Sequence, residues 1–240
     1  MSQSTSAGAR PKLLVACVGT ATEVGKTWVG ARTIEALRRR SIQVAARKPA
    51  ESFAVDGHEP LDSKVLAHTS GEPAEQVTPP QRRYAVALAP PMAAQRLGLA
   101  PPLIAELLVE LGWPSGCRVG WLETVGGVRS PVAADADSLG LCAAVDPDVV
   151  VLVGDASLGA IGAAVSAIDS ITLGAPALAD RTIVLMNRFD PDDDGHRENH
   201  RWLAEHLSQP VLTDIASLAN RLADAVGRAD QTFGAPGGSA

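Results

Sequence analysis

A glycine-rich segment, GTATEVGKT, constrains the fold of this chain more than any other feature. It runs from Gly19 to Thr27, follows the apolar run KLLVACV and opens a stretch with helical spacing. Five residues separate Gly19 from Gly25, whereas the usual phosphate-binding signature has about four between its glycines. Backbone N–H groups of such a turn, with the N-terminus of the following helix, can bind phosphate oxygens. The order of strand, turn, Gly-Lys-Thr and helix therefore predicts a nucleotide site despite the extra residue.

Short apolar runs alternate with helical patterns along the rest of the chain. Strands are predicted at 12–18, 42–48, 118–123, 148–155, 181–187 and 209–213. Helices are predicted at 25–40, 62–69, 101–112, 158–173, 196–207 and 217–226. Val-, Leu- and Ile-rich runs between helices are typical of a parallel sheet that is covered on both faces. We therefore predict a three-layer α/β/α fold with a mainly parallel central sheet and a P-loop.

The two ends of the chain differ in composition from its centre. Residues 1–11 and 229–240 are rich in small and polar residues, so we expect a disordered N-terminal tail and a flexible C-terminal tail. The segment between them, 12–228, is predicted to be one α/β domain, because 240 residues suit one large domain or two small ones.

Composition narrows the class of partner and the compartment. The formal net charge of −6 argues against broad binding to nucleic acid or to anionic membranes. The three cysteines lie far apart, as expected for buried thiols in a reducing compartment. The N-terminus has no apolar signal core, and no apolar run is long enough to span a bilayer. We expect a cytoplasmic protein that binds neither nucleic acid nor membrane.

Ligands of parallel sheets bind beyond the carboxyl ends of the strands, so the residues that follow the predicted strands are the candidates for a site. These segments are Gly19–Thr27, Lys48–Ser52, Glu123–Gly127, Asp155–Gly159 and Asn187. Within the first of them, Lys26 would reach the outer phosphates, and the Thr27 hydroxyl would bind Mg²⁺.

The long loop resembles the phosphate loop of the dethiobiotin synthetase family, which has a Thr-Glu-Val-Gly-Lys-Thr core. The resemblance continues in order with RKPAES around Lys48, with Asp62 at the start of a helix, with ETVGG from Glu123 and with Asn187 in LMNRFD. It runs from about residue 12 to residue 226. On these residues the chain is similar to dethiobiotin synthetases or to a close relative of them.

The resemblance implies an ATP-dependent carbon–nitrogen ligase of biotin biosynthesis that forms a homodimer. Its substrates would be 7,8-diaminopelargonic acid, CO₂ and ATP. One amine takes up CO₂ as a carbamate, the γ-phosphoryl group moves to this carbamate, and the second amine closes the cyclic urea of dethiobiotin. In such phosphoryl transfer the protein mainly positions reactants and neutralises charge.

The resemblance also assigns roles to the matching residues. Lys26 and Lys48 are the expected catalytic cations, which face the γ-phosphate and the carbamate. The expected Mg²⁺ ligands are Thr27, Asp62 and Glu123. The expected nucleotide-binding residues are Glu23, Val24, Gly25, Lys26, Thr27 and Asn187, and the expected substrate contacts are Thr22, Lys48, Ser52 and Thr124. Asn187 would read the adenine edge, whereas Glu23 could equally face the diamine or water.

The sequence departs from the family pattern at several places. Ala21 stands where the family often has Asp. Thr124 and Val125 bring branched side chains to a turn that normally has none, and these would obstruct a substrate that approaches the backbone closely. Gly162 replaces an Asn of the dimer interface that binds the substrate carboxylate, and Ala216 replaces a Pro of the adenine pocket. Carboxylate recognition and selectivity for ATP are therefore open.

Two other interpretations follow from these departures. One is a divergent homologue that binds nucleotide but has lost or altered the diamine reaction. The other is a partition-type ATPase switch, which has less support, because its signature Lys is absent near Ala21–Thr22 and no Lys-rich amphipathic terminal helix is visible.

The four tryptophans, Trp28 among them, are interpreted as packing residues and not as a stacking platform.

Overall fold

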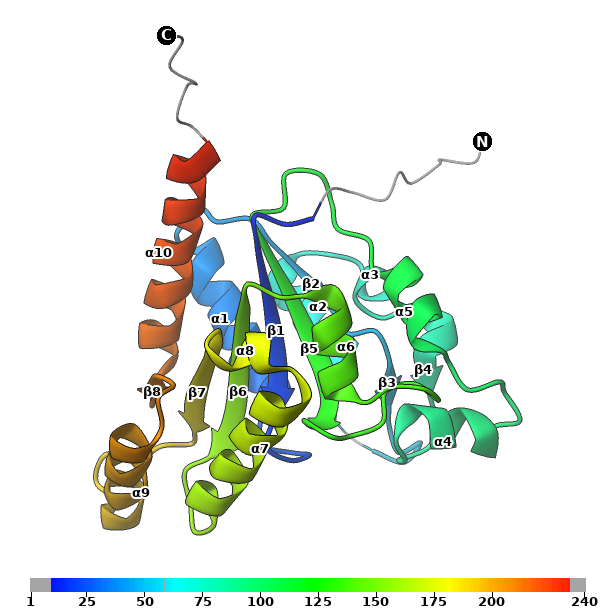
Figure 1. Ribbon diagram of the computed structural model, residues 1–240. Coiled ribbons are helices and arrows are strands. Elements are labelled where there is room, and N and C mark those ends of the chain that lie inside the picture. Colours follow the sequence, from blue (N-terminus) through cyan, green and yellow to red (C-terminus); the bar gives the residue numbers. More distant parts are fainter. Residues whose placement is uncertain (1–9, 58, 234–240) are drawn as a thin grey trace, which may run out of the picture.

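The computed structural model describes residues 10–57 and 59–233 of the chain. At its centre lies a six-stranded sheet in the order β2-β5-β1-β6-β7-β8, and every neighbouring pair is parallel (Figure 1). The strands are β1 (Leu13–Gly19), β2 (Val44–Arg47), β5 (Val119–Gly127), β6 (Val149–Asp155), β7 (Thr182–Asn187) and β8 (Val211–Leu212). Helices cover both faces of this sheet, which confirms the predicted three-layer α/β/α fold.

The helices fall into two layers and a side group. One face carries α1 (Lys26–Arg38), α2 (Asp62–Ser70), α3 (Ala74–Val77) and α10 (Ile215–Phe233). The other face carries α6 (Ser138–Val145), α7 (Ala160–Gly174) and α8 (Pro176–Ala179), with α9 (Asp194–His206) packed against α7. The side group, to the right of β5 in Figure 1, consists of β3 (Glu51–Ser52), a 3₁₀ turn (Pro80–Arg82), β4 (Arg83–Tyr84), α4 (Pro90–Arg96) and α5 (Ile104–Glu110).

Side chains of the central strands alternate between the two helical layers, as the pleat of a strand requires. In β1, Val15 and Cys17 pack beneath α1 and α10, whereas Ala16 and Val18 pack beneath α6 and α7. Both faces are buried, which is why these strands read as continuous apolar runs in the sequence. All three cysteines are free and buried, as expected.

The six central strands were all predictable, but the shorter elements were not. The sequence patterns miss β3, β4, α3, α4, α6 and α8, none of which exceeds eight residues. A hydrophobic period needs a window of about 11 residues or more before it separates helix from strand. Of the side group beside β5, only α5 is therefore predicted from the sequence, as the helix at 101–112, and the rest is known from the structure.

The last helix extends beyond the predicted end of the domain. Helix α10 continues to Phe233, past the predicted boundary at 228, and Asp230 within this extension pairs with Lys12 and Arg118. Residues 1–9, 58 and 234–240 lie outside the described residues, and with them most of the two predicted tails. One domain over 12–228 stays a prediction. In the part of the chain that is described, every helix is too short or too polar to cross a membrane.

Candidate active site

The loop between β1 and α1 depends on a glycine that no other residue can replace. Gly25 precedes α1 with a φ of 89°, and a Cβ atom there would lie 2.2 Å from Asn187 Nδ2. This left-handed conformation and the close contact both require glycine. None of the described side chains caps the N-terminus of α1. The first N–H groups of the helix therefore have no intrahelical partner and can bind an anion.

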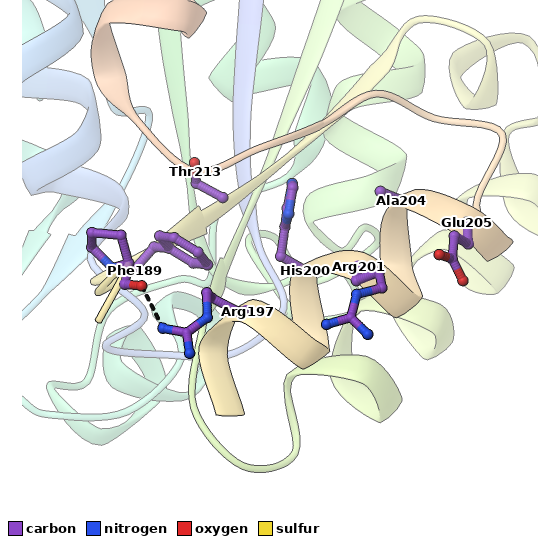
Figure 2. Close-up of a pocket in the computed structure, with 8 residues that line it drawn as sticks. Phe189, Arg197, His200, Arg201, Ala204, Glu205 and Thr213 are labelled. Carbon is purple, nitrogen blue, oxygen red and sulfur yellow. Dashed lines mark hydrogen bonds between the residues drawn. The ribbon is translucent and has the colours of Figure 1, made fainter. Parts of the chain in front are cut away.

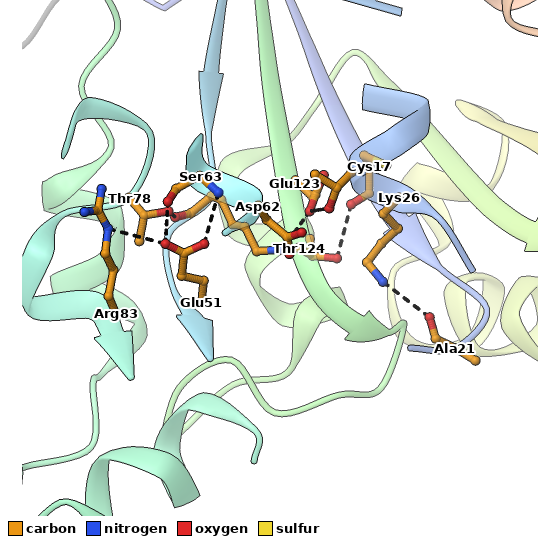
Figure 3. Close-up of polar contacts among 12 residues, drawn as sticks. Cys17, Ala21, Lys26, Glu51, Asp62, Ser63, Thr78, Arg83, Glu123 and Thr124 are labelled. Carbon is orange, nitrogen blue, oxygen red and sulfur yellow. Dashed lines mark hydrogen bonds and ion pairs between the residues drawn. The ribbon is translucent and has the colours of Figure 1, made fainter. Parts of the chain in front are cut away.

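Lys26, the first residue of α1, bends back over this loop. Its Nζ donates a hydrogen bond to the Ala21 carbonyl over 3.3 Å, and the residue is only 7% exposed (Figure 3). Burial lowers the pKa of Lys26; the negative charge of Glu123 opposes this effect, and the positive charge of Lys48 adds to it. An ammonium group in this situation gains stability from a bound anion.

Four side chains from different segments meet around Glu123 in the middle of β5, which continues to Gly127 beyond the predicted strand end at 123. Glu123 is fully buried, and its Oε1 accepts hydrogen bonds from Lys48 Nζ at 2.7 Å and from Thr27 Oγ1 at 2.8 Å. Lys48 Nζ also pairs with Asp62, the first residue of α2. Figure 3 shows Asp62 beside Glu123, with Lys26 farther along the same edge of the sheet. The structure thus brings both predicted catalytic lysines and all three predicted metal ligands into one neighbourhood.

Strong mutual attraction keeps this cluster charged. Burial alone would lower the pKa of Lys48, but the carboxylates of Glu123 and Asp62 raise it well above its ordinary value. Burial alone would raise the pKa of Asp62, yet Lys48 holds it below its ordinary value. Lys48 and Asp62 are therefore both charged at neutral pH. The pair of Lys48 with Glu123 is buried on both sides, and removing one member of such a pair typically costs about 3–5 kcal/mol.

The main chain of Lys48 is fixed by α3 and the residue after it. The Lys48 N–H donates to the Val77 carbonyl at 2.8 Å, and the Thr78 hydroxyl donates to the Lys48 carbonyl at 2.7 Å. Because Lys48 is also 4% exposed, its ammonium group can reach only the few partners that surround it. This geometry separates it from an ordinary solvated lysine at a strand end.

The oxygen atoms around Lys48 fit a magnesium ion. Glu123 Oε2 is buried and has no hydrogen-bond partner in the described part of the chain, so this oxygen is free to contact a bound cation. Mg²⁺ prefers hard oxygens from one or two carboxylates and completes its shell with phosphates and water. Thr27, Asp62 and Glu123 offer such a set. This set has only two carboxylates, and its third member is a hydroxyl. Within residues 10–57 and 59–233, no larger cluster, with three or more His, Cys, Asp or Glu, could hold a metal ion.

Two predicted substrate contacts present hydroxyl groups at this edge of the sheet. Thr22 is exposed and lies against the tip of β5, because a Cβ atom on Gly126 would be 3.4 Å from Thr22 Oγ1. Ser52 lies in β3, and its Oγ is buried without a hydrogen-bond partner among the described residues. A buried hydroxyl without a partner is costly unless a ligand satisfies it. Both residues remain candidates for binding substrate.

The structure corrects the expectation for Thr124 and Val125. Thr124 is fully buried, and its hydroxyl donates to the Cys17 carbonyl at 3.2 Å. Val125 packs in an apolar cluster with residues of α5 and α6. The Thr124 side chain is therefore engaged inside the protein, and we no longer count it as a substrate contact. The expected obstruction by Thr124 is wrong for the same reason, and the half-buried Val125 packs against that apolar cluster.

A second set of contacts fixes the opposite side of the loop. Asn187 Nδ2 donates to the Val24 carbonyl at 2.9 Å, and Arg188 Nη2 donates to the Glu23 carbonyl at 3.0 Å. Arg188 also pairs with Asp155 at 2.8 Å. Glu23 and Arg188 both have left-handed φ values, 62° and 58°, which non-glycine residues rarely adopt. Two neighbouring residues of the β7 end thus hold two neighbouring carbonyls of the loop.

Sequence reasoning missed Arg188, whose only signal was its position directly after the strand-end residue Asn187. That Asn187 reads adenine stays a prediction, since its amide nitrogen is engaged with the loop itself. The replacement Gly162 lies exposed on α7, and a Cβ atom there would meet nothing within 4 Å. Ala216 lies in the first turn of α10.

Two surface grooves open on the β7–β8 side of the molecule. One, of about 590 Å³, lies between α9, the loop after β7 and Thr213, and Phe189 and His200 line it (Figure 2). It contains none of the predicted site residues. The other, of about 490 Å³, runs along α1 from Trp28 to Arg40 and is bounded by Ile215 and Ala216. This second groove begins next to the phosphate loop.

The parallel sheet, the glycine-rich loop between β1 and α1 and the Lys-Thr pair that opens α1 define a P-loop nucleotide-binding protein. The ATP-dependent dethiobiotin synthetase of Phenylobacterium zucineum (strain HLK1) is 32% identical over 196 residues, which cover 78% of this chain and 82% of the relative. That of Caulobacter vibrioides (strain NA1000 / CB15N) is 32% identical over 178 residues, which cover 73% and 80%. The chain belongs to the dethiobiotin synthetase family, a family of ligases, as its sequence predicts.

No family model matches the chain. Among solved structures, a DUF1611 family protein from Anabaena variabilis ATCC 29413 superposes with a TM-score of 0.51 at 15% identity. The match covers 91% of this chain and 58% of that one. At this level of identity the likeness concerns the fold alone.

Proposed function

We propose that this protein is an ATP-dependent dethiobiotin synthetase that forms the cyclic urea of dethiobiotin from 7,8-diaminopelargonic acid and CO₂. One observation carries the proposal: Lys26 and Lys48 are both buried, Lys48 pairs with Glu123 at 2.7 Å, and Thr27, next to Lys26, donates to the same carboxylate at 2.8 Å. Two cations at one edge of a sheet suit a reaction in which negative charge collects between a γ-phosphate and a carbamate.

The reaction would proceed in three steps. A substrate amine takes up CO₂, loses a proton and becomes a carbamate. A carbamate oxygen attacks the γ-phosphorus of ATP, and ADP leaves. The second amine then attacks the carbamate carbon, phosphate leaves, and the urea ring closes. The chain contributes position and charge, which is the main role of a protein in phosphoryl transfer.

Named residues would divide these tasks. The N–H groups of Glu23, Val24, Gly25 and Thr27 would hold the phosphates together with Lys26, and Thr22 and Ser52 would bind the diamine or its carbamate. Lys48, held by Asp62 and Glu123, would present its ammonium group to the anionic intermediate. Thr27, Asp62 and Glu123 would hold Mg²⁺, which neutralises phosphate charge when it is bound.

The decisive experiment measures phosphate release and dethiobiotin mass with purified protein, Mg²⁺-ATP, bicarbonate and 7,8-diaminopelargonic acid. We expect one phosphate for each dethiobiotin and no turnover when either the diamine or bicarbonate is left out. ATP hydrolysis that is indifferent to the diamine would contradict the proposal. Loss of both signals in Lys26→Ala would tie the activity to the phosphate loop.

Gly162 favours one alternative function. An Asn at this place of α7 would supply an amide for the substrate carboxylate across a homodimer interface, and glycine has no side chain to do so. A divergent homologue that uses another amine is therefore the second candidate. Replacement of the diamine by its methyl ester separates the two, since a site that reads the carboxylate loses activity with the ester. The homodimer and the cytoplasmic location are parts of the same proposal.

A further inference from the structure

Glu51 in β3 carries a buried carboxylate that lies outside the cluster around Glu123. It is only 3% exposed, although it stands at the end of a short surface segment that begins with Lys48. Its Oε2 accepts a hydrogen bond from the N–H of Ser63 at 3.0 Å, and its Oε1 accepts one from the Ser63 hydroxyl (Figure 3). Because Ser63 belongs to α2, Glu51 joins the segment after β2 to the start of this helix.

The contact with Ser63 supplies a cap that α2 lacks in its own sequence. The residue before the helix is Leu61, whose apolar side chain forms no cap hydrogen bond. The N–H groups in the first turn of a helix have no intrahelical partner, and Glu51 satisfies one of them. A carboxylate at this end also interacts favourably with the positive end of the helix dipole. The start of α2 is therefore held by a residue 12 positions away in the chain.

Asp62, the first residue of α2, depends on this end of the helix for its position. Its side chain is 44% exposed and pairs with Lys48, so packing alone does not immobilise it. Ser63, the next residue, is fully buried, and fixing its main chain also fixes the direction in which the Asp62 carboxylate points. A metal ligand that is held in place beforehand loses less conformational entropy when the ion binds.

The remaining partner of Glu51 is an arginine of β4. Arg83 Nε lies 3.3 Å from Glu51 Oε1, and Arg83 Nη2 donates to the Ala74 carbonyl at 2.6 Å. This guanidinium group supplies the positive charge that a buried carboxylate needs. Glu75 in α3 also pairs with Arg83, at 3.9 Å, but its side chain is 62% exposed. The two glutamates therefore share an arginine, and the hydrogen bonds to Ser63 distinguish Glu51.

We propose that Glu51 is a positioning residue, which caps α2 from β3 and thereby holds Asp62 in the orientation that binds Mg²⁺. This inference rests on the proposed function, because that function makes Asp62 a magnesium ligand. Both oxygens of Glu51 are engaged by Ser63 and Arg83, so Glu51 acts through Asp62 and does not bind the metal itself. Loss of Glu51 lowers the affinity for the metal and leaves the phosphate contacts of the loop Gly19–Thr27 unchanged.

The test uses Mn²⁺ as the probe, since it binds the same hard oxygens as Mg²⁺ and its paramagnetic resonance signal reports the free ion. The protein is titrated in the presence of a non-hydrolysable ATP analogue, so the readout needs no turnover. Glu51→Ala should weaken Mn²⁺ binding by about ten- to a hundredfold, the usual effect of losing a residue that orients a metal ligand. Without metal, its affinity for the analogue should change by less than about threefold.

The same variant should show a matching change in turnover. The Mg²⁺ concentration that gives the half-maximal rate of dethiobiotin formation should rise by about the factor found with Mn²⁺, whereas kcat should recover at saturating Mg²⁺. A change that merely loosened the fold would lower kcat at every Mg²⁺ concentration.

Two further variants grade the effect, and a third is the control. Ser63→Ala removes one of the two hydrogen bonds and should weaken Mn²⁺ binding about fivefold. Glu51→Gln keeps the length of the side chain and one carbonyl oxygen, and it should recover most of the affinity that Glu51→Ala loses. Glu75→Ala removes a carboxylate from the same arginine and should bind Mn²⁺ normally.

Three results would overturn the proposal. The first is unchanged Mn²⁺ affinity in Glu51→Ala. The second is an equal loss of metal-free analogue binding, which would mean that Glu51 supports the fold as a whole. The third is an equal loss in Glu75→Ala, which would assign the effect to Arg83. If circular dichroism shows that Glu51→Ala does not fold, Ser63→Ala decides, and normal Mn²⁺ affinity in that variant overturns the proposal.

These measurements also separate the inference from the proposed function. If Glu51→Ala binds Mn²⁺ weakly but the unaltered protein forms no dethiobiotin, the proposed function is wrong and the positioning role stands. If dethiobiotin forms with the same Mg²⁺ dependence in both proteins, only the positioning role is wrong.

Discussion

The two sides of the phosphate loop are built on opposite principles. On the β2–β5 side, Lys48 and Glu123 are buried and paired. On the β7–β8 side, Arg188 has 59% of its side chain exposed, and an open groove runs along α1. The contrast places fixed charges on the side where the reaction would occur and adaptable surface on the side where the nucleoside would lie.

This difference has an energetic meaning. Charges in a dry environment interact strongly and cannot change partners cheaply, so the buried side tolerates few substitutions. Exposed ion pairs contribute about 0–1 kcal/mol each, so the open side can vary its residues with small cost to folding. The replacement at Ala216 lies on the open side, and the predicted catalytic lysines lie on the buried one. The effects of substitutions on the two sides should therefore differ in magnitude and in the property that changes.

Lys48→Met should produce the largest effect. It keeps the length of the side chain but removes the charge beside Glu123 and Asp62, and loss of one group that stabilises developing charge costs roughly a hundred- to a thousandfold in turnover. We expect dethiobiotin formation to fall by this factor while the Kd for ATP changes less than about threefold. Lys64→Met, at an exposed position two residues after Asp62 in α2, is the control. Normal turnover of Lys48→Met would show that the buried side does not take part in the reaction.

Glu123→Gln tests whether the buried side also supports the fold. The amide keeps the shape but leaves Lys48 with Asp62 as its remaining carboxylate partner, and we expect a loss of roughly 3 kcal/mol in the free energy of unfolding. Urea denaturation at neutral pH measures it. Glu198→Gln breaks an exposed pair with Arg201 and should cost less than about 1 kcal/mol. If both variants lost the same free energy of unfolding, buried and exposed charges would contribute equally to stability, contrary to the prediction.

The sequence predicts the buried side better than the open one, for a physical reason. Lys26, Thr27 and Glu123 could be found because they follow strands whose carboxyl ends must meet at one edge of a parallel sheet. Their meeting depends on topology, which the alternation of strands and helices reveals. Trp28 is 51% exposed, so its interpretation as a packing residue is wrong. This exposure had a local signal that was not used, because Trp28 lies outside the buried face of α1 and shares its side of the helix with Arg32 and Glu35.

Thr124 shows a signal that was present and unused. Successive side chains of a strand point to opposite faces. Trp121 packs beneath α1, so Glu123, two residues on, shares its face, and Thr124 must point to the other. Arg188 carried no such signal, because its left-handed conformation follows from the contacts that it makes with Asp155 and the loop.

Arg188→Ala should act on the loop as a positioning change and not on the reaction. It removes the hydrogen bond to the Glu23 carbonyl, and we expect the KM for ATP to rise about fivefold with kcat nearly unchanged. Affinity for tripolyphosphate, which has the phosphates but no nucleoside, should fall by the same factor. Arg201→Ala, which has a similar exposure on α9, should change none of these values. A fall in kcat at constant KM would mean that Arg188 faces the reacting groups.

Asp155→Asn should have the smallest effect on the free energy of unfolding. The way in which this effect changes with pH shows whether the charge of the carboxylate is responsible for it. Partial burial alone would raise the pKa of Asp155, but hydrogen bonds from Ser157 and the charge of Arg188 lower it to about 2. A depressed pKa in the folded state stabilises the protein above the ordinary pKa near 3.9, and this stabilisation disappears as pH falls towards 2. Because the side chain is 32% exposed, solvent screening limits the contribution to less than about 1 kcal/mol.

Unfolding by urea at several pH values between 6 and 3 should therefore show a small deficit for Asp155→Asn that shrinks as the pH falls. Asp169→Asn, at an exposed position on α7, should show no such trend. A deficit that is the same at pH 6 and at pH 3 would mean that shape, and not charge, holds Arg188 against the loop. The contacts of Arg188 would then depend on shape, whereas those of Lys48 on the buried side depend on charge.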